Sequence, residues 1–520
     1  MRMLKFRHCA TSHMVTSGPV QQDRVPTRLE RIPWGWWVLL GTVLRGVHGV
    51  AAHTWNTSPD QLAWGLGLED AWRSGGAAYL QWVHYPHEGG SLLLSLLARV
   101  FVPLASVMPP LSWAALVADS GCRAVQILVA RRSFSPQAAL AFTLWTVLAV
   151  PLMLPWGTIN MGLHALVSFA PFLLLAAVQR PVERPLLLGV GVGALCMLAY
   201  DAALLVPAYV GFVWLGASGV QARAGHVLKF LLGAVLGLLP HVLTRLWVDH
   251  GFQLEQLPVF SIRGLEQDPL HLADAPGRLL AFWTTWLPGS LFMTAVDAPL
   301  VRVLVLITAS LLVWGGLGLR GVPAAQRRVV YMGLWLIAVF WAVVVFAPFF
   351  EPRDEGAGYV YYRYFPFIVP LVALLVLEGL VQRRGTWAAW GFVGFCGLSS
   401  LVFLVRQEDR PLPMDEATGW VLGRKYGHDP QLLGRIMAGA GTERKYQLTF
   451  GAGWGTAAAM FDRRTATDTA AMHRFQRTRA MWPVGELTAF DHGVERAFGP
   501  DVTPRLDPAI RELLDLEGIP

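Results

Sequence analysis

Residues suited to chemistry gather between positions 53 and 109. Carboxylates stand at Asp60, Glu69 and Asp70, and a run further on reads His-Tyr-Pro-His-Glu-Gly-Gly from position 84. Carboxylates, imidazoles and aromatic rings in one long loop suit the binding of a polar head group. Asp60 also has a structural interpretation, because an Asp that follows Pro59 is a typical helix N-cap. Both interpretations stay open from the sequence.

A second stretch, residues 350–363, carries arginines suited to phosphate. It includes Arg353 and ends on Arg363, which opens an apolar segment. The planar guanidinium group can donate two parallel hydrogen bonds to a phosphate. The alternative for Arg363 is an anchor at the membrane interface that pairs with Glu351 or Asp354.

The segments of the chain between these two stretches, which must position their side chains, are mostly apolar. Hydrophobic residues make up 54% of the chain and charged residues 15%, where soluble proteins carry about 25% charged residues. A helix needs about 20 apolar residues to cross a bilayer. Segments near that length predict an all-α polytopic membrane protein with about eleven transmembrane helices. They are 34–52, 110–130, 136–155, 161–179, 185–200, 202–218, 227–247, 299–319, 329–349, 364–381 and 387–405.

The apolar run 89–108 is ambiguous by hydropathy, and charge decides how it is interpreted. Basic clusters follow several of the predicted spans, and cytoplasmic turns are enriched in Lys and Arg. If 89–108 crossed the membrane, Arg131 and Arg132 would lie outside, so we expect an interfacial or re-entrant helix. The clusters are Arg131/Arg132, Arg180/Arg184, Arg223/Lys229, Arg320/Arg327/Arg328 and Arg383/Arg384.

This orientation predicts a multi-pass protein of the inner membrane. The basic segment 1–33 is cytoplasmic. The loops 53–109, 248–298 and 350–363 lie on the outer face, and so does a soluble helical domain at 406–520. The net charge of +7 comes from the short clusters between spans. We therefore expect the lipid bilayer as a partner and no nucleic acid.

The C-terminal domain contains a weak internal repeat. Phe450-x-x-Gly453-x-x-x-Ala457 has the same spacing as Phe490-x-x-Gly493-x-x-x-Ala497. Residues seven apart share a helix face, and glycine permits close helix approach. The pattern predicts small helical hairpins stacked as a cap, with chance similarity in a Gly/Ala-rich segment as the alternative.

Charged residues inside predicted spans require partners or a function. Asp119 and Arg123 are one helical turn apart, which suits an ion pair and leaves a proton relay as the alternative. Arg45 and His48 lie in the first span, where each can reach the interface or face the bundle. The four cysteines are widely spaced, and we expect neither a disulfide framework nor a metal motif.

The layout resembles the GT-C class of membrane glycosyltransferases, which take sugar from a polyprenyl-phosphate carrier. In that class a large outer loop with an acidic residue or pair follows the first span. A proline motif, an interfacial helix and a span ending in an Ala-Arg-Arg-x-Phe-like turn come next. A late Arg-Tyr-x-x-Pro-like entry into a span is also common. The corresponding features within residues 34–405 are Asp60-Gln61, Tyr85-Pro86-His87-Glu88-Gly89-Gly90, the run 89–108, Ala130-Arg131-Arg132-Ser133-Phe134 and Tyr362-Arg363-Tyr364-Phe365-Pro366.

The resemblance implies a GT-C-like fold and sugar transfer to an envelope acceptor on the outer face, in an inverting reaction. Asp60, with Asp70 and Glu69 behind it, is then the expected general base. Arg363, with Arg353, would stabilise the charge that grows on the departing lipid phosphate. The class often has an acidic pair where this chain has Asp60 followed by glutamine.

His84, Tyr85 and His87 are expected to help bind the lipid-linked sugar. Two other classes of function remain open. A transporter or flippase would need paired charges deep in the bundle and symmetry between the halves. A non-catalytic protein of envelope assembly would use the outer domain to recruit a partner. The sequence identifies neither a cofactor nor the sugar.

Overall fold

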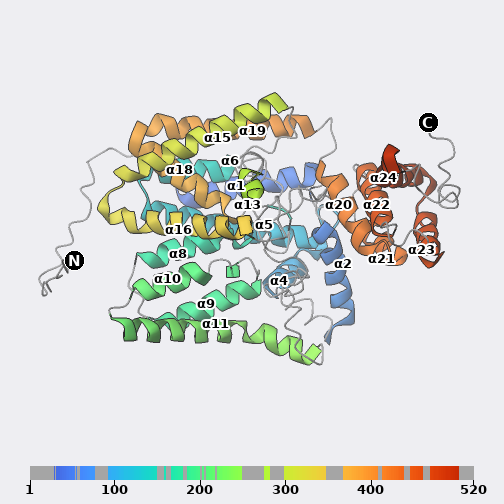
Figure 1. Cartoon of the computed structure of the whole chain (residues 1–520), viewed down its shortest axis with the longest axis horizontal. Helices are drawn as coiled ribbons and strands as arrows, with labels where there is room; N and C mark the ends of the chain where they lie inside the picture. Colours follow the sequence, from blue (N-terminus) through green and yellow to red (C-terminus); the bar gives the residue numbers. More distant parts are fainter. Residues whose placement is uncertain are drawn as a thin grey trace, which may run out of the picture.

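Every regular element that the structure describes is a helix, which confirms the all-α prediction. The structure is a computed structural model, shown in Figure 1. It describes residues 29, 31–52, 54, 59–76, 92–148, 157–159, 166–179, 184–198, 202–203, 206–216, 219–248, 275–281, 298–346, 367–407, 413–438, 445–460 and 469–502.

Each of the eleven apolar segments predicted above overlaps one of the described helices. We call α1 to α19 the bundle. Its α-helices are α1 (Trp34–Ala52), α2 (Pro59–Ser74), α4 (Leu92–Val100), α5 (Pro110–Ser133), α6 (Pro136–Leu148), α8 (Ala170–Val178), α9 (Pro185–Leu198), α10 (Val206–Leu215), α11 (Val220–Val248), α13 (Ala275–Ala281), α15 (Ala298–Gly318), α16 (Ala324–Phe346), α18 (Val369–Arg384) and α19 (Thr386–Gln407). Short 3-10 turns are η3 (Val102–Leu104), η5 (Leu166–Phe169) and η11 (Leu319–Gly321).

Two described helices meet both the length and the hydropathy expected of a membrane span. They are α5 over Pro110–Ser133 and α11 over Val220–Pro240. Helix α4, within the ambiguous run 89–108, has nine residues, or about 14 Å at 1.5 Å per residue. That length is less than half of a hydrocarbon core about 30 Å thick.

Proline and glycine set many of the helix ends. Helices α5, α6 and α9 begin at a proline, whose missing N–H costs nothing at the first helical position. Helix α18 ends at Arg384 and is followed by its C-cap residue Gly385, which has φ +77. Only glycine adopts this left-handed conformation without strain, so α19 can start at once in a new direction.

Helix α18 is the centre of its side of the bundle. All residues from Val369 to Leu380 are buried, and α18 packs against α6, α15, α16 and α19. A helix that is apolar on every side belongs in a core. Its contact with α15 is close, because a Cβ on Gly318 would lie 1.8 Å from the Gly379 carbonyl oxygen.

A second close crossing joins α9 and α11. A Cβ added to Gly193 would lie 2.1 Å from the carbonyl oxygen of Ala234, and one on Gly237 would lie 2.3 Å from that of Val190. Both helices carry a Gly-x-x-x-Gly pair at this contact, the spacing that lets membrane helices approach closely. This pair of motifs was missed in the sequence.

The C-terminal helices form a separate stack, which we call the tail. It consists of α20 (Pro413–Tyr426), α21 (Pro430–Ala438), α22 (Lys445–Met460), α23 (Thr469–Ala480) and α24 (Val484–Val502). Helix α22 packs between α20 and α24. All five helices lie within the C-terminal segment 406–520 predicted to be helical, and residues 503–520 lie outside the described residues.

The internal repeat marks a reciprocal helix contact in the tail. A Cβ on Gly453 would lie 2.0 Å from the carbonyl oxygen of Phe490, and one on Gly493 would lie 1.8 Å from that of Phe450. The predicted role of these glycines in close helix approach is therefore confirmed. Helix α20 carries a third copy of the spacing at Trp420, Gly423 and Gly427, and Gly423 faces α22 in the same way.

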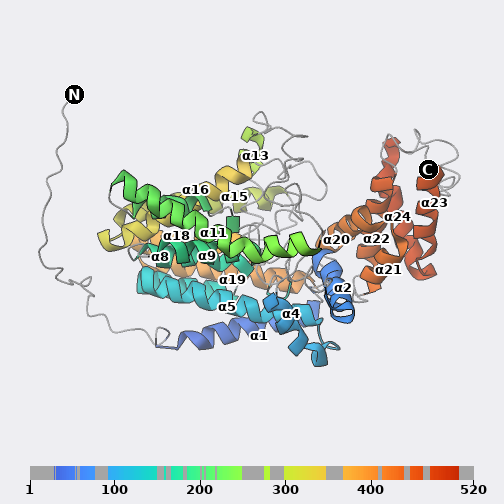
Figure 2. The same cartoon turned by 90° about the horizontal axis from the view of Figure 1, so that it is seen from below.

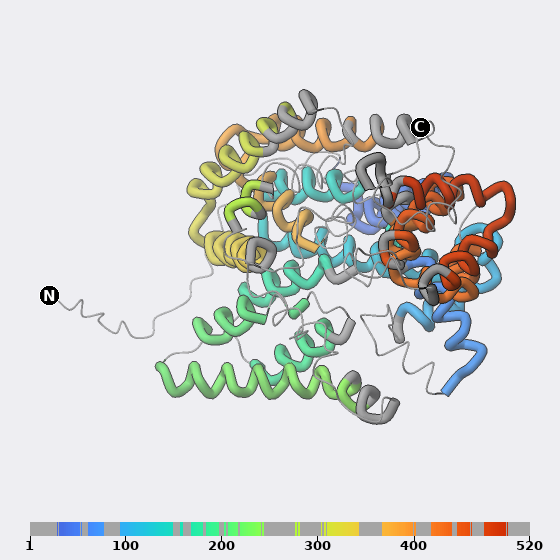
Figure 3. Tube along the Cα trace, turned by 45° about the vertical axis from the view of Figure 1, so that its right-hand side comes forward, coloured from blue at the N-terminus to red at the C-terminus, as the bar shows by residue number. Residues whose placement is uncertain are grey.

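The bundle has two different ends. Helix α2 and the tail lie at one, the tail end (Figures 1 and 2). Figure 3 turns that end forward and shows α2 beside the tail helices, which contact it through α20 and α21. The turns that carry the Lys and Arg clusters, which we call the basic turns, lie at the opposite end of the bundle, the basic end. Side-chain contacts that link these turns are Gln179–Ser133, Ser135–Glu378, Arg384–Trp314, Arg328–Phe212 and Arg223–Trp214.

The bundle and the tail differ in what they expose. Large apolar side chains are exposed along many bundle helices, whereas in the described tail only Tyr446 and Val484 are. On α11, along the lower edge of the bundle in Figure 1, a whole face is apolar and exposed. Its exposed residues include Leu228, Leu231, Leu232, Val235, Leu236, Leu239 and Leu243.

Candidate functional site

Helix α2 is fixed at the tail end by a buried polar contact. Gln61 is 3% exposed, and its Nε2 donates a hydrogen bond of 2.7 Å to the hydroxyl of Ser112 on α5. Trp64 and Leu68 are buried on the same helix. The loop predicted to carry chemistry therefore begins with a helix anchored to α5.

Asp60 directly precedes this anchor. Helix α2 begins at Pro59, so the backbone of Asp60 lies in the first helical turn. A carboxylate there is stabilised by the partial positive charge of the helix N-terminus. Because α2 begins one residue earlier, Asp60 follows the N-cap position. Its side chain lies outside the described part of the structure, so its role as general base stays a prediction.

Glu69 and Asp70 both meet cations. Arg435 on α21 donates from Nη2 to both carboxylate oxygens of Asp70, at 2.8 Å each, while Glu69 lies 3.5 Å from Arg73 one turn along α2. The Asp70 and Arg435 side chains are 41% and 52% exposed, and exposed pairs contribute about 0–1 kcal/mol. Asp70 thus helps join α2 to the tail.

Five predicted site residues lie outside the described residues: His84, Tyr85, His87, Arg353 and Arg363. The expected convergence of Asp60 with Arg363 on one outward cavity therefore stays a prediction. Among the residues that are described, no three His, Cys, Asp or Glu side chains come together to hold a metal ion.

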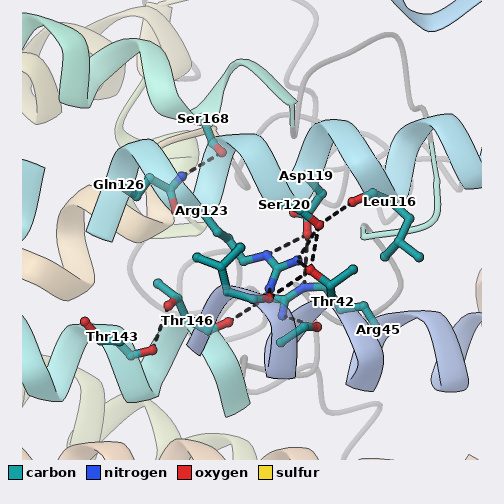
Figure 4. A network of polar contacts seen from close by, with 12 residues as sticks. Thr42, Arg45, Leu116, Asp119, Ser120, Arg123, Gln126, Thr143, Thr146 and Ser168 are labelled. Carbon is teal, nitrogen blue, oxygen red and sulfur yellow. Dashed lines mark hydrogen bonds and ion pairs between the residues drawn. The ribbon is translucent and has the colours of Figure 1, made fainter. Parts of the chain in front are cut away.

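A buried charged network lies inside the bundle, where α1, α5 and α6 meet (Figure 4). Asp119 Oδ2 accepts a hydrogen bond of 2.8 Å from Arg123 Nε, as the one-turn spacing predicts. Arg45 Nε lies 3.4 Å from the same oxygen. The three residues are between 1% and 6% exposed, so Arg45 faces the bundle.

Other guanidinium N–H groups bind uncharged acceptors, some on the same helix and some on a neighbouring one. Arg45 donates to the carbonyl oxygens of Thr146, at 2.8 Å, and Gly41, at 3.2 Å. Arg123 donates to the hydroxyls of Thr42, at 3.1 Å, and Ser120, at 3.2 Å. The network therefore fixes the register of three helices.

A small cavity adjoins this network. It offers ≈ 10 Å³ to the centre of a water-sized molecule, about the space that one water occupies. On its wall Gln126 donates a hydrogen bond of 2.9 Å to Ser168. Arginines stay charged, so they pass no protons, and the structural interpretation of Asp119 and Arg123 is favoured over a relay.

No family model, curated protein or solved structure matches this chain. The resemblance to the GT-C class therefore rests on the motifs and layout. Two features of the site were missed from the sequence. Gln61 was interpreted as a departure from an acidic pair, although it is a buried anchor. Arg435 lies far along the chain from Asp70, and no spacing rule links them.

Proposed function

We propose that the bundle crosses a lipid bilayer and that the tail lies outside it. The exposed apolar faces of the bundle helices support this proposal. Each of these exposed faces would be unfavourable in water, because burial of apolar surface contributes roughly 25 cal/mol per Å². Soluble monomers also rarely expose large apolar patches. The described tail exposes only two large apolar side chains, as a water-facing domain should.

The proposed orientation follows from charge. The basic turns lie together at the end of the bundle away from the tail, as the contacts between them require. Because basic turns are retained in the cytoplasm, the tail and α2 face outwards. Helix α4 is then too short to cross and belongs near the outer interface.

At this outer face we infer transfer of a sugar from a polyprenyl phosphate to an envelope acceptor. The supporting observation is the position of α2: it follows the first bundle helix, is anchored through Gln61, and carries Asp60 in its first turn. Asp60 would take a proton from the acceptor as the acceptor attacks the anomeric carbon. The lipid phosphate leaves with the electrons of the broken C–O bond, and Arg363 stabilises its charge.

The other carboxylates of α2 receive different roles in this proposal. Asp70 and Glu69 already have cationic partners, so we assign Asp70 to docking of the tail. Gln61 serves as an anchor, and its presence does not argue for a lost active site. The buried network gives little support to a transporter, because its cavity holds about one water.

The test is deletion of the gene in its host, followed by mass spectrometry of polyprenyl-phosphate sugars and envelope glycans. We expect one lipid-linked sugar to accumulate and one glycan to be lost. Reintroduced wild-type protein and the Asp70→Asn variant should restore the normal lipid-linked sugar level and the lost glycan. The Asp60→Asn variant, expressed at the same level, should restore neither of them. Restoration by Asp60→Asn would refute the assignment of Asp60 as the general base. Unchanged lipid and glycan profiles after deletion would overturn the proposed function.

A further inference from the structure

The buried network carries an unbalanced charge. Arg45 and Arg123 share the single carboxylate of Asp119, which leaves a formal charge of +1 by simple addition. Among the described residues that line the adjoining cavity, Asp119 is the only acid. An uncompensated charge away from water is strongly unfavourable, and the two carbonyl oxygens that accept from Arg45 carry no full negative charge.

Donors without acceptors face the same place. Arg45 is 1% exposed, and its Nε has no hydrogen-bond acceptor, since the 3.4 Å approach to Asp119 is an ion pair without hydrogen-bond alignment. The indole Nε1 of Trp145 is also buried without an oxygen or nitrogen acceptor among the described residues, and meets the thiol of Cys396, a weak acceptor. Arg45 and Trp145 both line the cavity.

The other lining groups are mostly donors or can become so. They are the guanidinium of Arg123, the amide of Gln126 and the hydroxyl of Ser168, whereas the hydroxyl of Thr146 already donates to the carbonyl oxygen of Thr143. A net positive wall rich in N–H and O–H groups favours an anion over a cation, because a cation needs several oxygen ligands. The ≈ 10 Å³ open to the centre of a water-sized sphere gives room for about one small occupant, which favours a monatomic ion over the larger phosphate or carboxylate.

We propose that this cavity binds one chloride ion. The ion accepts hydrogen bonds from the guanidinium groups and from the polar groups around them. It neutralises the excess charge and locks α1, α5 and α6 together. The proposal is independent of sugar transfer, because it concerns the assembly of the bundle and not the outer face.

The first test is thermal unfolding of the full chain in lipid nanodiscs, in sodium chloride and in sodium gluconate at equal ionic strength. We expect a saturable rise in the midpoint with chloride, of about 2–4 °C. Arg123→Gln removes the excess charge and should lose this chloride dependence. Arg99→Gln is the matched control, because Arg99 is exposed and lies over the ring of Trp72; it should keep the dependence.

The second test does not depend on a variant that folds. Crystals of wild-type protein grown in bromide should show an anomalous peak within hydrogen-bond distance of Arg45 Nε. Equal midpoints in chloride and gluconate for wild type would overturn the proposal. So would a full chloride response in a folded Arg123→Gln variant, or density for a water without a bromide peak.

Discussion

Asp119 holds two arginines with one carboxylate oxygen, at 2.8 Å and 3.4 Å. Part of this arrangement follows from sequence, because an Asp and an Arg four apart share a helix face. Arg45 could be placed in the first span but not beside Asp119, since only tertiary packing brings α1 against α5. Gln61 shows the same limit, because its hydroxyl partner Ser112 lies on another helix.

Replacing Asp119 by Asn should therefore destabilise the protein strongly. The side chain keeps its size, but two buried cations lose their counter-charge, at a cost of about 3–5 kcal/mol. Unfolding of the purified variant in nanodiscs measures the loss. Asp70→Asn is the control, since its exposed pair with Arg435 contributes about 0–1 kcal/mol; equal stability of the two variants would contradict a structural role for the network.

Glycine decides how closely the helices approach each other. Hydropathy predicts where along the chain the apolar helices lie, because a long apolar run in lipid is stable only as a helix. It does not predict which helices pack against each other. The pairing of α9 with α11 depends on Gly193 and Gly237, and the Gly-x-x-x-Gly spacing in both helices was the available signal. In the tail, the repeat identified Gly453 and Gly493, but the sequence did not show that each packs against the phenylalanine carbonyl of the other copy.

Gly193→Leu should force α9 away from α11. Its Cβ would meet the Ala234 carbonyl at 2.1 Å, which backbone atoms cannot relieve without shifting the helix. We expect a clear loss of folded protein, measured as the monodisperse fraction in size-exclusion chromatography after detergent extraction.

Helix α9 supplies its own control for that experiment. Gly191 has no atom within 4 Å of an added Cβ, so Gly191→Leu tests the same substitution two residues away. It should leave folding almost unchanged. Equal losses in both variants would mean that the close crossing does not hold these helices together.

In the whole molecule, the basic turns lie at one end of the apolar bundle and the tail lies at the other. The charge pattern of the sequence predicts this separation only if the run 89–108 does not cross. The short α4 agrees with that condition, since it has nine residues. The sequence could not show how α2 and the tail meet, because Asp70 and Arg435 are distant in the chain.

Single cysteines introduced at the two ends should report opposite sides of the membrane. Val484 in the tail is 86% exposed, and Ala325 is exposed at the start of α16, beside the basic turn. In right-side-out vesicles of a variant without native cysteines, an impermeant maleimide should label Val484→Cys at once and Ala325→Cys only after permeabilisation. Labelling of both before permeabilisation would refute the orientation, and protection of Val484→Cys alone would place the tail in the cytoplasm. The latter result would also move Asp60 to the cytoplasmic face, so this topology test bears directly on where the proposed sugar transfer takes place.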